Sequence, residues 1–300
     1  MNYKKIFKTT KSRAFVLGLL RFVPDKMMLK VQYRIKHGRK LNLKNPTRYT
    51  EKLQWYKLNY KNPIMHTCVD KYKVREFVKE KGLGHILVNL YAKYNSAKEI
   101  NVEALPDKFV IKTTNGSGGL NVLVCNDKTK IDFNDVKEKL ACKKFKSRTG
   151  GREWAYYGLE PGIIVEELLI NEKNPEAGVN DYKIFCYNGK AKYVIVDIDR
   201  YIGHKRNFYD VNWNRIEGES DCPACDINIE KPENFEQMID VAERLSEDFP
   251  YVRVDLYNVS GKIYFGELTF YPWSGYVQFN PDELDELFGK DFKLEKYKSE

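Results

Sequence analysis

Residues 252–257 read Val-Arg-Val-Asp-Leu-Tyr and residues 265–269 read Phe-Gly-Glu-Leu-Thr, and these two segments decide the fold. The turn Asn258-Val-Ser-Gly261 separates them, so the pattern predicts a β-hairpin. Asp255 and Glu267 then stand in otherwise apolar strands, where a carboxylate is costly to bury unless it is paired or binds a cation. Such oxygen ligands suit Mg²⁺, which prefers one or two carboxylates together with substrate phosphates.

Arg253 lies two residues before Asp255, and the period of two in a strand places both side chains on one face. The guanidinium and the carboxylate therefore point into the same space. Two interpretations stay open: a structural Arg–Asp ion pair, or an arginine and an acid that both face a substrate.

The hairpin is the last of several strands predicted in a chain that mixes strands and helices. Asn188-Gly189 is the strongest two-residue hairpin signal, with strands expected on either side at 182–187 and 191–198. Further strands are expected at 108–113, 121–125 and 163–169, and helices at 132–142 and 234–247. Antiparallel hairpins mixed with helices favour an α+β fold over a doubly wound parallel sheet.

Positive charge is concentrated in the first 60 residues, which carry 16 Lys and Arg against only Asp25 and Glu51. Such a segment could bind nucleic acid, an anionic membrane or an acidic polymer. The alternative is a solvated helical face without a partner. No apolar run approaches the roughly 20 residues of a spanning helix. An apolar content of 42% argues against disorder, and six scattered cysteines do not form a disulfide framework. No small-residue cleavage site follows the first apolar segment, so we expect a cytoplasmic protein.

A glycine-rich loop separates the strands expected at 108–113 and 121–125. It follows Lys112 and comprises Asn115, Gly116, Ser117, Gly118 and Gly119. Glycines let backbone N–H groups approach phosphate oxygens closely, and a nearby lysine supplies positive charge. The loop lacks the spacing of a Walker A or Rossmann motif, so an ordinary flexible hairpin turn is the alternative.

Two adjacent acids, Glu166 and Glu167, follow the apolar residues that begin at Ile163. A strand end of this kind can offer a backbone carbonyl and an N–H to an adenine edge, with an acid near the exocyclic amine. The alternative is an edge strand that carries one outward acid.

Two polar motifs carry weaker signals. Cys222 and Cys225 have half of a zinc-site spacing, but no second pair follows, so we expect free thiols in a loop. His204, Lys205 and Arg206 are predicted to form a basic turn that either binds an anion or is plain surface. No histidine is spaced to activate a nucleophile, so we infer no hydrolase triad.

Taken in order, these elements resemble the ATP-grasp superfamily, and within it the TupA-like family of teichuronopeptide biosynthesis, which is found with bacterial polysaccharide genes. The motifs that carry the resemblance span nearly the whole chain. They are Leu41-Asn-Leu-Lys-Asn-Pro46, Glu51-Lys-Leu-Gln-Trp55, Asp70-Lys-Tyr72, Lys108-Phe-Val-Ile-Lys112, Val252-Arg-Val-Asp-Leu-Tyr257 and Gly266-Glu-Leu-Thr269. The resemblance implies two α+β subdomains that grip ATP, at 70–161 and 162–300, after a helical, basic region at 1–69.

The resemblance also implies which residues contact the nucleotide. Lys71 and Lys112 match lysines that reach the phosphates, and residues 115–119 match the lid. The other implied contacts are Glu166 with the backbone of Glu167 and Leu169 at the adenine, Asp181 at the ribose, and Lys183 beside it.

A second set of residues is implied in metal binding and catalysis. Asp255 and Glu267 match two magnesium carboxylates, and Thr269 stands where many relatives have an asparagine ligand. Arg253 matches an arginine that stabilises the acyl-phosphate and the tetrahedral intermediate, and Lys112 also acts on the transferring phosphate. Arg206 is the candidate contact to an acceptor carboxylate.

The activity implied is an ATP- and Mg²⁺-dependent ligase that forms an amide through an acyl-phosphate. We expect an acidic saccharide as acceptor, a uronic acid of a surface polysaccharide or its precursor, and an amino acid or similar amine as co-substrate. Residues 1–60 are the expected contact with an anionic inner membrane face, and no nucleic acid is expected. The alternatives are a glycosyltransferase that uses a nucleotide sugar and a non-catalytic protein that binds an acidic polymer.

Overall fold

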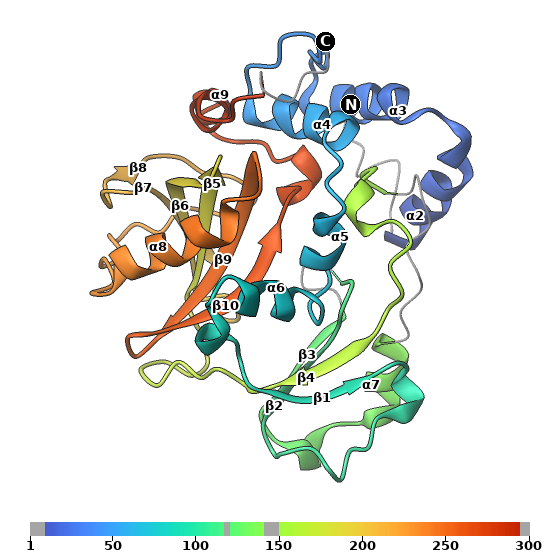
Figure 1. Cartoon of the computed structure of the whole chain (residues 1–300), viewed down its shortest axis with the longest axis vertical. Coiled ribbons are helices and arrows are strands. Elements are labelled where there is room, and N and C mark those ends of the chain that lie inside the picture. The colour runs from blue at the N-terminus through green and yellow to red at the C-terminus, as the bar shows by residue number, and fades with distance from the viewer. Residues whose placement is uncertain (1–9, 117–120, 141–149, 295–300) are drawn as a thin grey trace.

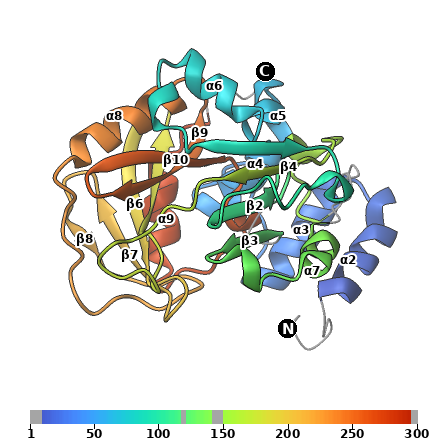
Figure 2. The same ribbon diagram turned by 90° about the horizontal axis from the view of Figure 1, so that it is seen from below.

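Two antiparallel sheets form the frame of the molecule. The computed structural model describes residues 10–116, 121–140 and 150–294, and in them the strand orders are β1-β4-β2-β3 and β10-β9-β5-β6-β7-β8. Figures 1 and 2 show the smaller sheet beside the larger one. The strands are β1 (Leu90–Tyr94), β2 (Phe109–Thr113), β3 (Val122–Cys125), β4 (Ile163–Glu166), β5 (Asp181–Tyr187), β6 (Lys190–Ile198), β7 (Lys205–Asp210), β8 (Arg215–Ile216), β9 (Tyr251–Val259) and β10 (Lys262–Thr269).

The helices connect and cover the sheets. The α-helices are α2 (Thr10–Leu19), α3 (Asp25–His37), α4 (Tyr49–Asn59), α5 (Ile64–Cys68), α6 (Val74–Glu80), α7 (Phe133–Lys139), α8 (Phe235–Ser246) and α9 (Glu283–Lys290). Short 3₁₀ turns are η1 (Leu20–Phe22), η2 (Gly84–Ile86), η3 (Ala97–Glu99), η4 (Lys128–Lys130), η5 (Trp154–Tyr156) and η6 (Pro272–Gly275). In the described residues, no helix combines the length and apolarity needed to cross a membrane.

The small sheet has one apolar face and one face toward the large sheet. Phe109 and Ile111 of β2 are fully buried with Val136 of α7 in one hydrophobic cluster. Because side chains alternate along a strand, Val110 and Lys112 point the opposite way, and both line the cavity between the sheets.

The large sheet is covered by α8 on one face and by α4 and α9 on part of the other (Figure 1). Phe185 of β5 packs on Tyr49 of α4 and Phe288 of α9, with ring centroids 5.3 and 5.6 Å apart. Asp181 and Lys183 lie on the same face as Phe185 by the period of two. This face is therefore aromatic where helices cover it and charged where it meets the cavity.

From α4 onward, the N-terminal region is part of the core and does not form a separate arm. Tyr49, Leu53 and Tyr56 are fully buried in the cluster of the large sheet. The hydroxyls of Tyr49 and Tyr251 are 2.6 Å apart. Asp285 of α9 accepts hydrogen bonds from the N–H and hydroxyl of Thr50 at 2.8 and 2.7 Å. The hydrogen bonds between Thr50 and Asp285 thus hold α4 against α9.

Three features differ from the expectations from sequence. The second subdomain was expected to begin at 162, but β4 pairs with β1 and β2, so the small sheet extends to Glu166. The strand β1 was not predicted. His204-Lys205-Arg206 is not a surface turn, because Lys205 begins β7 and Arg206 is buried opposite Asp197 of β6.

Candidate functional site

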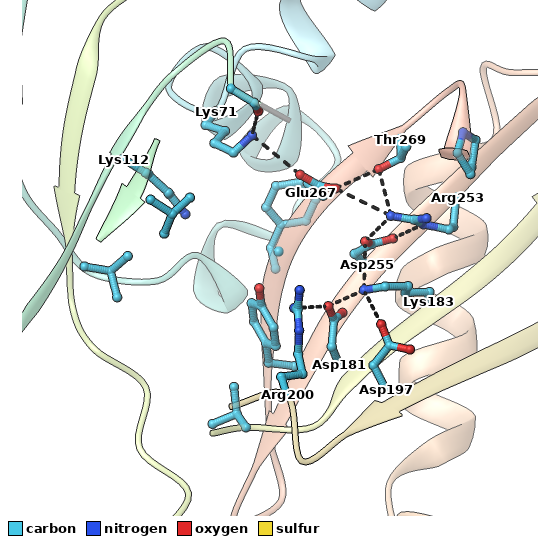
Figure 3. Close-up of a pocket in the computed structure, with 18 of the residues that line it drawn as sticks. Lys71, Lys112, Asp181, Lys183, Asp197, Arg200, Arg253, Asp255, Glu267 and Thr269 are labelled. Atoms are coloured by element: carbon cyan, nitrogen blue, oxygen red, sulfur yellow. Dashed lines mark hydrogen bonds and ion pairs between the residues drawn. The ribbon is translucent and has the colours of Figure 1, made fainter. Parts of the chain in front are cut away.

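A cavity of about 730 Å³ lies between the two sheets and collects most of the predicted site residues. Figure 3 shows Lys71 and Lys112 reaching it from one side and the acids of the large sheet from the other. The predicted residues that line it are Lys71, Lys112, Gly116, Glu166, Glu167, Leu169, Asp181, Lys183, Arg206, Arg253, Asp255, Glu267 and Thr269. Segments up to 198 positions apart in sequence therefore meet at one place.

The strand register aligns the acids and bases of the cavity floor. Glu267 of β10 is opposite Asp255 of β9, and Asp255 is opposite Lys183 of β5. A register shift between Phe265 and Glu267 gives this alignment, and Gly266 occupies the bulge. A Cβ on Gly266 would lie 2.9 Å from the carbonyl oxygen of Asp255, so the close approach of the strands requires glycine.

Arg253 and Asp255 form a two-pronged ion pair. Nε and Nη2 of the arginine each lie 2.6 Å from a different oxygen of the carboxylate. Arg253 Nη2 also donates to Thr269 Oγ1 at 3.2 Å and lies 3.5 Å from Glu267 Oε1. Burial raises the pKa of Asp255, while Arg253 and Lys183 act against that rise. Arg253 and Asp255 are thus ion-paired with each other, and both also line the cavity.

Glu267 is held ionised by its surroundings. Desolvation raises its pKa, but the positive charges of Lys71, Arg253 and Lys183 reverse this effect and bring the pKa down to about 2. Thr269 donates to Glu267 Oε1 at 2.9 Å, and Lys71 Nζ lies 3.5 Å from Oε2. The second predicted metal carboxylate is therefore charged and partly exposed to the cavity.

Lys183 connects the acids of three strands. Its ammonium contacts Asp181 and lies 3.4 Å from Asp255 and 3.6 Å from Asp197 (Figure 3). Arg200 Nη1 reaches the same oxygen of Asp181 at 2.7 Å. The other oxygen of Asp181 is buried and has no hydrogen-bond partner within the described residues, so one acceptor of the predicted ribose site is open.

Arg206 and Asp197 form a second ion pair at the far end of the cavity. Nε and Nη2 of Arg206 lie 2.6 and 2.9 Å from the two oxygens of Asp197. Desolvation raises the pKa of Asp197, but Arg206 and Lys183 outweigh it and hold the pKa well below its ordinary value. His204 Nε2 lies 3.3 Å from Asp197, and the Trp273 ring lies 5.2 Å from the Arg206 guanidinium.

On the small-sheet side, Glu166 forms ion pairs with two basic side chains. Lys112 Nζ lies 2.6 Å from one of its oxygens, and Arg75 Nη1 donates to the other at 3.0 Å. Arg75 Nη2 also donates to the carbonyl of Val88 at 2.9 Å. The carboxylate expected near an adenine amine is thus the partner of Lys112 and Arg75 here.

The glycine-rich loop begins at the cavity wall. Lys71 Nζ donates to the carbonyl of Gly116, and the Lys71 N–H donates to the carbonyl of Thr114 at 2.8 Å. Asn115 is fully buried, whereas Gly116 lines the cavity. The predicted contacts Ser117, Gly118 and Gly119 lie outside the described residues.

The segment between the sheets supplies the predicted hinge. The Glu167 N–H donates to the Asn89 carbonyl at 2.9 Å, so this donor is already used within the protein. Glu167 and Leu169 line the cavity next to the apolar side chains of Val88, Val110 and Val124. The hinge therefore combines apolar cavity walls with the charged Glu166 at its start.

The oxygen donors of the floor fit a magnesium ion bound with substrate phosphates. Asp255 and Glu267 are adjacent hard carboxylates, which suit Mg²⁺. Within the ranges that the structure describes, no cluster of three or more His, Cys, Asp or Glu residues forms a metal cage. Mg²⁺ does not need such a cage. To bind the ion, one oxygen of Asp255 would have to lose its hydrogen bond from Arg253. Cys222 and Cys225 are free thiols, as expected.

The sequence analysis did not identify the cavity residues Asp197, Arg200 and Trp273, or Arg75, which contacts the cavity residue Glu166. Asp197 follows the apolar residues 193–196 near the end of β6, and an acid in an apolar strand was the signal used for Asp255. Trp273 and Ser274 both have positive φ angles, 49° and 56°, in the η6 segment. The surrounding sequence does not predict this conformation, because non-glycine residues rarely adopt it.

Two unlike antiparallel sheets that close on one charged cavity are the architecture of an ATP-grasp protein. The model of the family described as TupA-like ATP-grasp matches residues 51–293, and the chain belongs to this family. The predicted family and α+β ATP-grasp fold are thereby confirmed. No match was found among curated proteins.

Solved structures give distant likenesses. The D-alanine–D-alanine ligase of Bacillus anthracis is 18% identical, with a TM-score of 0.43, and the match covers 68% of this chain and 57% of that one. The L-amino acid ligase of Bacillus licheniformis is 14% identical, with a TM-score of 0.45 and coverage of 85% and 55%. This chain spans little more than half the length of either protein.

Proposed function

We propose that this protein is an ATP-dependent carboxylate–amine ligase that works through an acyl-phosphate. The observation that carries the proposal is the cavity itself, where Lys71 and Lys112 face Asp255 and Glu267 across two sheets in a member of the ATP-grasp family. Lysines that face acids suit a polyphosphate bound with a divalent cation. The antiparallel pairing of every described strand lends no support to the nucleotide-sugar transferase, which would call for a Rossmann-like parallel sheet.

We propose one orientation for the nucleotide in this cavity. Its base would occupy the apolar hinge end beside Leu169, and its phosphates would extend toward Lys71 and Lys112. Asp181 keeps one buried oxygen open for a ribose hydroxyl. Asp255 and Glu267 would hold Mg²⁺, which supplies charge neutralisation for the transferring phosphate.

The reaction needs no covalent enzyme nucleophile. An oxygen of the acceptor carboxylate attacks the γ-phosphorus of ATP, and the bond to the β–γ bridging oxygen breaks, which leaves an acyl-phosphate and ADP. An amine then attacks the acyl carbon, loses a proton, and inorganic phosphate departs as the amide forms. Lys112 and Arg253 are placed to stabilise negative charge on the transferring group and on the tetrahedral intermediate.

Arg206 is the candidate contact for an acidic acceptor. It lies at the cavity wall, paired with Asp197 and Asp221, so a substrate carboxylate would have to replace one of these acids at the guanidinium. We propose a uronic acid of a bacterial surface polysaccharide, or its lipid- or nucleotide-linked precursor, as acceptor, and an amino acid or similar amine as the second substrate. The reaction would take place at the cytoplasmic face of the membrane.

Calorimetry of ATP binding with and without Mg²⁺ tests the proposal. The wild-type protein should bind ATP more tightly with Mg²⁺. Glu267→Gln should abolish most of that difference because it removes the partly exposed carboxylate, and Lys112→Met should weaken binding about tenfold or more because it removes a phosphate contact.

Glu236→Gln, which removes an exposed acid on α8, is the matched control and should bind like wild type. ATP binding that is indifferent to both cavity substitutions would contradict the proposed site. Preferential binding of a UDP-sugar would favour the transferase, and binding of polyuronate without any nucleotide binding would favour the non-catalytic protein.

A further inference from the structure

Exposed apolar side chains are concentrated in the first helices that the structure describes. Among the residues whose side chains the structure describes, thirteen large apolar residues are exposed, and six of them lie between residues 15 and 35. Figures 1 and 2 show α2 and α3 at the edge of the molecule, away from the large sheet. The six, with their exposed fractions, are Phe15 68%, Leu19 61%, Phe22 78%, Met27 60%, Val31 46% and Ile35 39%.

The helix α3 has three distinct faces. Met28, Leu29 and Tyr33 are buried against the body of the protein. At about 100° per residue, Met27, Val31 and Ile35 form one exposed stripe, because they are four residues apart. Lys26, Lys30 and Arg34 form a second exposed stripe directly beside it. An apolar band thus runs next to a basic band along the outer side of the helix.

This surface is positively charged, and within the described residues its basic stripe has no acid paired with it. None of the described residues forms an ion pair with Lys26, Lys30 or Arg34. Asp25, the one acid between residues 15 and 40, lies 2.9 Å from Arg152, whose side chain is almost fully buried. The basic stripe is therefore free to meet an external anion.

We propose that residues 15–35 form a docking surface for an anionic lipid bilayer. Adjacent apolar and basic bands on one exposed side are the pattern of a helix that lies in a membrane interface. An acidic polymer would satisfy the lysines but would leave Phe15, Phe22 and Met27 in water. A second copy of this chain would bring its own positive charge to the same face. The bilayer alone satisfies both bands.

The docking surface contacts two residues, Arg152 and Tyr276, that lie close in sequence to residues of the cavity wall. Arg152 donates to the carbonyls of Leu20 and Val23 at 2.8 and 3.1 Å. The Tyr276 hydroxyl, just after η6, donates to Gln32 of α3 at 2.6 Å. Because η6 lines the cavity, a bilayer bound at α3 would fix the orientation of the cavity relative to the membrane.

Co-sedimentation of the full chain with vesicles tests this surface without any substrate, so its outcome is independent of the proposed function. Binding should be strong to phosphatidylcholine vesicles that contain half phosphatidylglycerol, weak to pure phosphatidylcholine, and weaker at high salt. Lys26→Gln with Lys30→Gln and Arg34→Gln should lower the partition coefficient by roughly tenfold to a hundredfold. Phe22→Ser with Met27→Ser and Val31→Ser should lower it by about tenfold or more.

Matched control variants remove the same kinds of side chain elsewhere. Ile227→Ser with Tyr91→Ser changes exposed apolar residues, and Lys79→Gln with Lys130→Gln and Lys190→Gln changes exposed lysines. Both controls should bind vesicles like wild type. Equal binding to neutral vesicles, an apolar triple variant that binds normally, or self-association through this face in light scattering would overturn the proposal. So would equally tight binding of polygalacturonate that the apolar variant leaves unchanged.

Discussion

At the scale of single residues, the cavity floor is a balance of buried charges. Arg253 satisfies both oxygens of Asp255, and Lys183 adds a second cation 3.4 Å away. Each charge is tolerable because its partner is present, whereas an isolated buried ion would be very costly. Under the proposed function, a magnesium nucleotide would have to exchange with these ion-pair partners.

Removal of one member of the pair should destabilise the protein strongly. Arg253→Met leaves Asp255 with less compensation, so we expect a loss of about 3–5 kcal/mol in the free energy of unfolding. Arg253→Met combined with Asp255→Asn should recover a large part of that loss, because the uncompensated charge is gone. Urea denaturation of the single and double variants measures both effects.

The double-variant cycle separates a coupled pair from two independent residues. Additive losses would contradict the pairing seen between Arg253 and Asp255. Asp240→Asn, at an exposed acid on α8 that lies 3.9 Å from Arg244, is the control and should change stability little.

The residues of the site were predictable to the extent that each one breaks a local pattern. Asp255 and Glu267 stand out as acids in apolar strands, and Lys112 stands out beside a glycine-rich loop. Arg75 and Arg200 break no pattern, since a charged residue in a helix or after a strand is ordinary. Their roles come from contacts with Glu166 and Asp181, 91 and 19 residues away in sequence, which only the folded chain brings about.

At the scale of elements, hairpins were predictable because their signals are local. Asn188 and Gly189 take the positive φ angles, 49° and 74°, that a tight two-residue turn requires. The strands β1 and β7 carry no such signal. Lys205-Arg-Asn207 resembles a surface turn until Arg206 meets Asp197 across the sheet, because a cross-strand ion pair lets a charged segment remain buried.

The bulge at Gly266 sets the alignment of the two predicted metal carboxylates. Gly266→Ala would place a Cβ 2.9 Å from the Asp255 carbonyl oxygen and 3.3 Å from the Tyr257 ring, so the strands must separate. We expect a loss of about 1–3 kcal/mol in stability and weaker Mg²⁺-dependent ATP binding. Denaturation and calorimetry on the same variant measure the two effects.

Gly261→Ala is the matched control in the turn of the same hairpin. Its φ of +79° makes alanine unfavourable, but no atom lies within 4 Å of the added Cβ. It should lower stability by about 1 kcal/mol and leave ATP binding unchanged. Equal effects of the two substitutions on ATP binding would show that the bulge does not position the site.

At the scale of the whole molecule, Lys57 joins three parts that are distant in sequence. Its buried ammonium donates to the carbonyls of Gly151 and Ser274 at 2.8 and 2.7 Å and to Gln54 at 3.2 Å. The helix α4, the segment that leads to η5 and the η6 wall of the cavity meet at this one group. Removal of residues 1–60 would therefore remove core and cavity support together, and the substitutions in α3 are the cleaner test of the docking surface.

Lys57 should also make the free energy of unfolding depend on pH in the alkaline range. Burial lowers the pKa of Lys57 to about 8 from an ordinary value of 10.5, with Glu153 acting against that change. Between these two values the unfolded chain binds more protons than the folded one, so stability rises with pH across this window. Below about pH 8 both states are charged, and the burial penalty of the ammonium is present in full.

The comparison of wild type with Lys57→Met isolates this contribution. Urea denaturation at pH 8, 9 and 10 should show wild-type stability gaining on the variant by about 2 kcal/mol over this range. Lys79→Met, at an exposed lysine of α6, is the control. Its free energy of unfolding should change with pH as that of wild type does, which accounts for the titration of other groups. A stability difference between wild type and Lys57→Met that stays constant with pH would mean that the ammonium keeps its charge in the core, held by its carbonyl acceptors as firmly as water holds it.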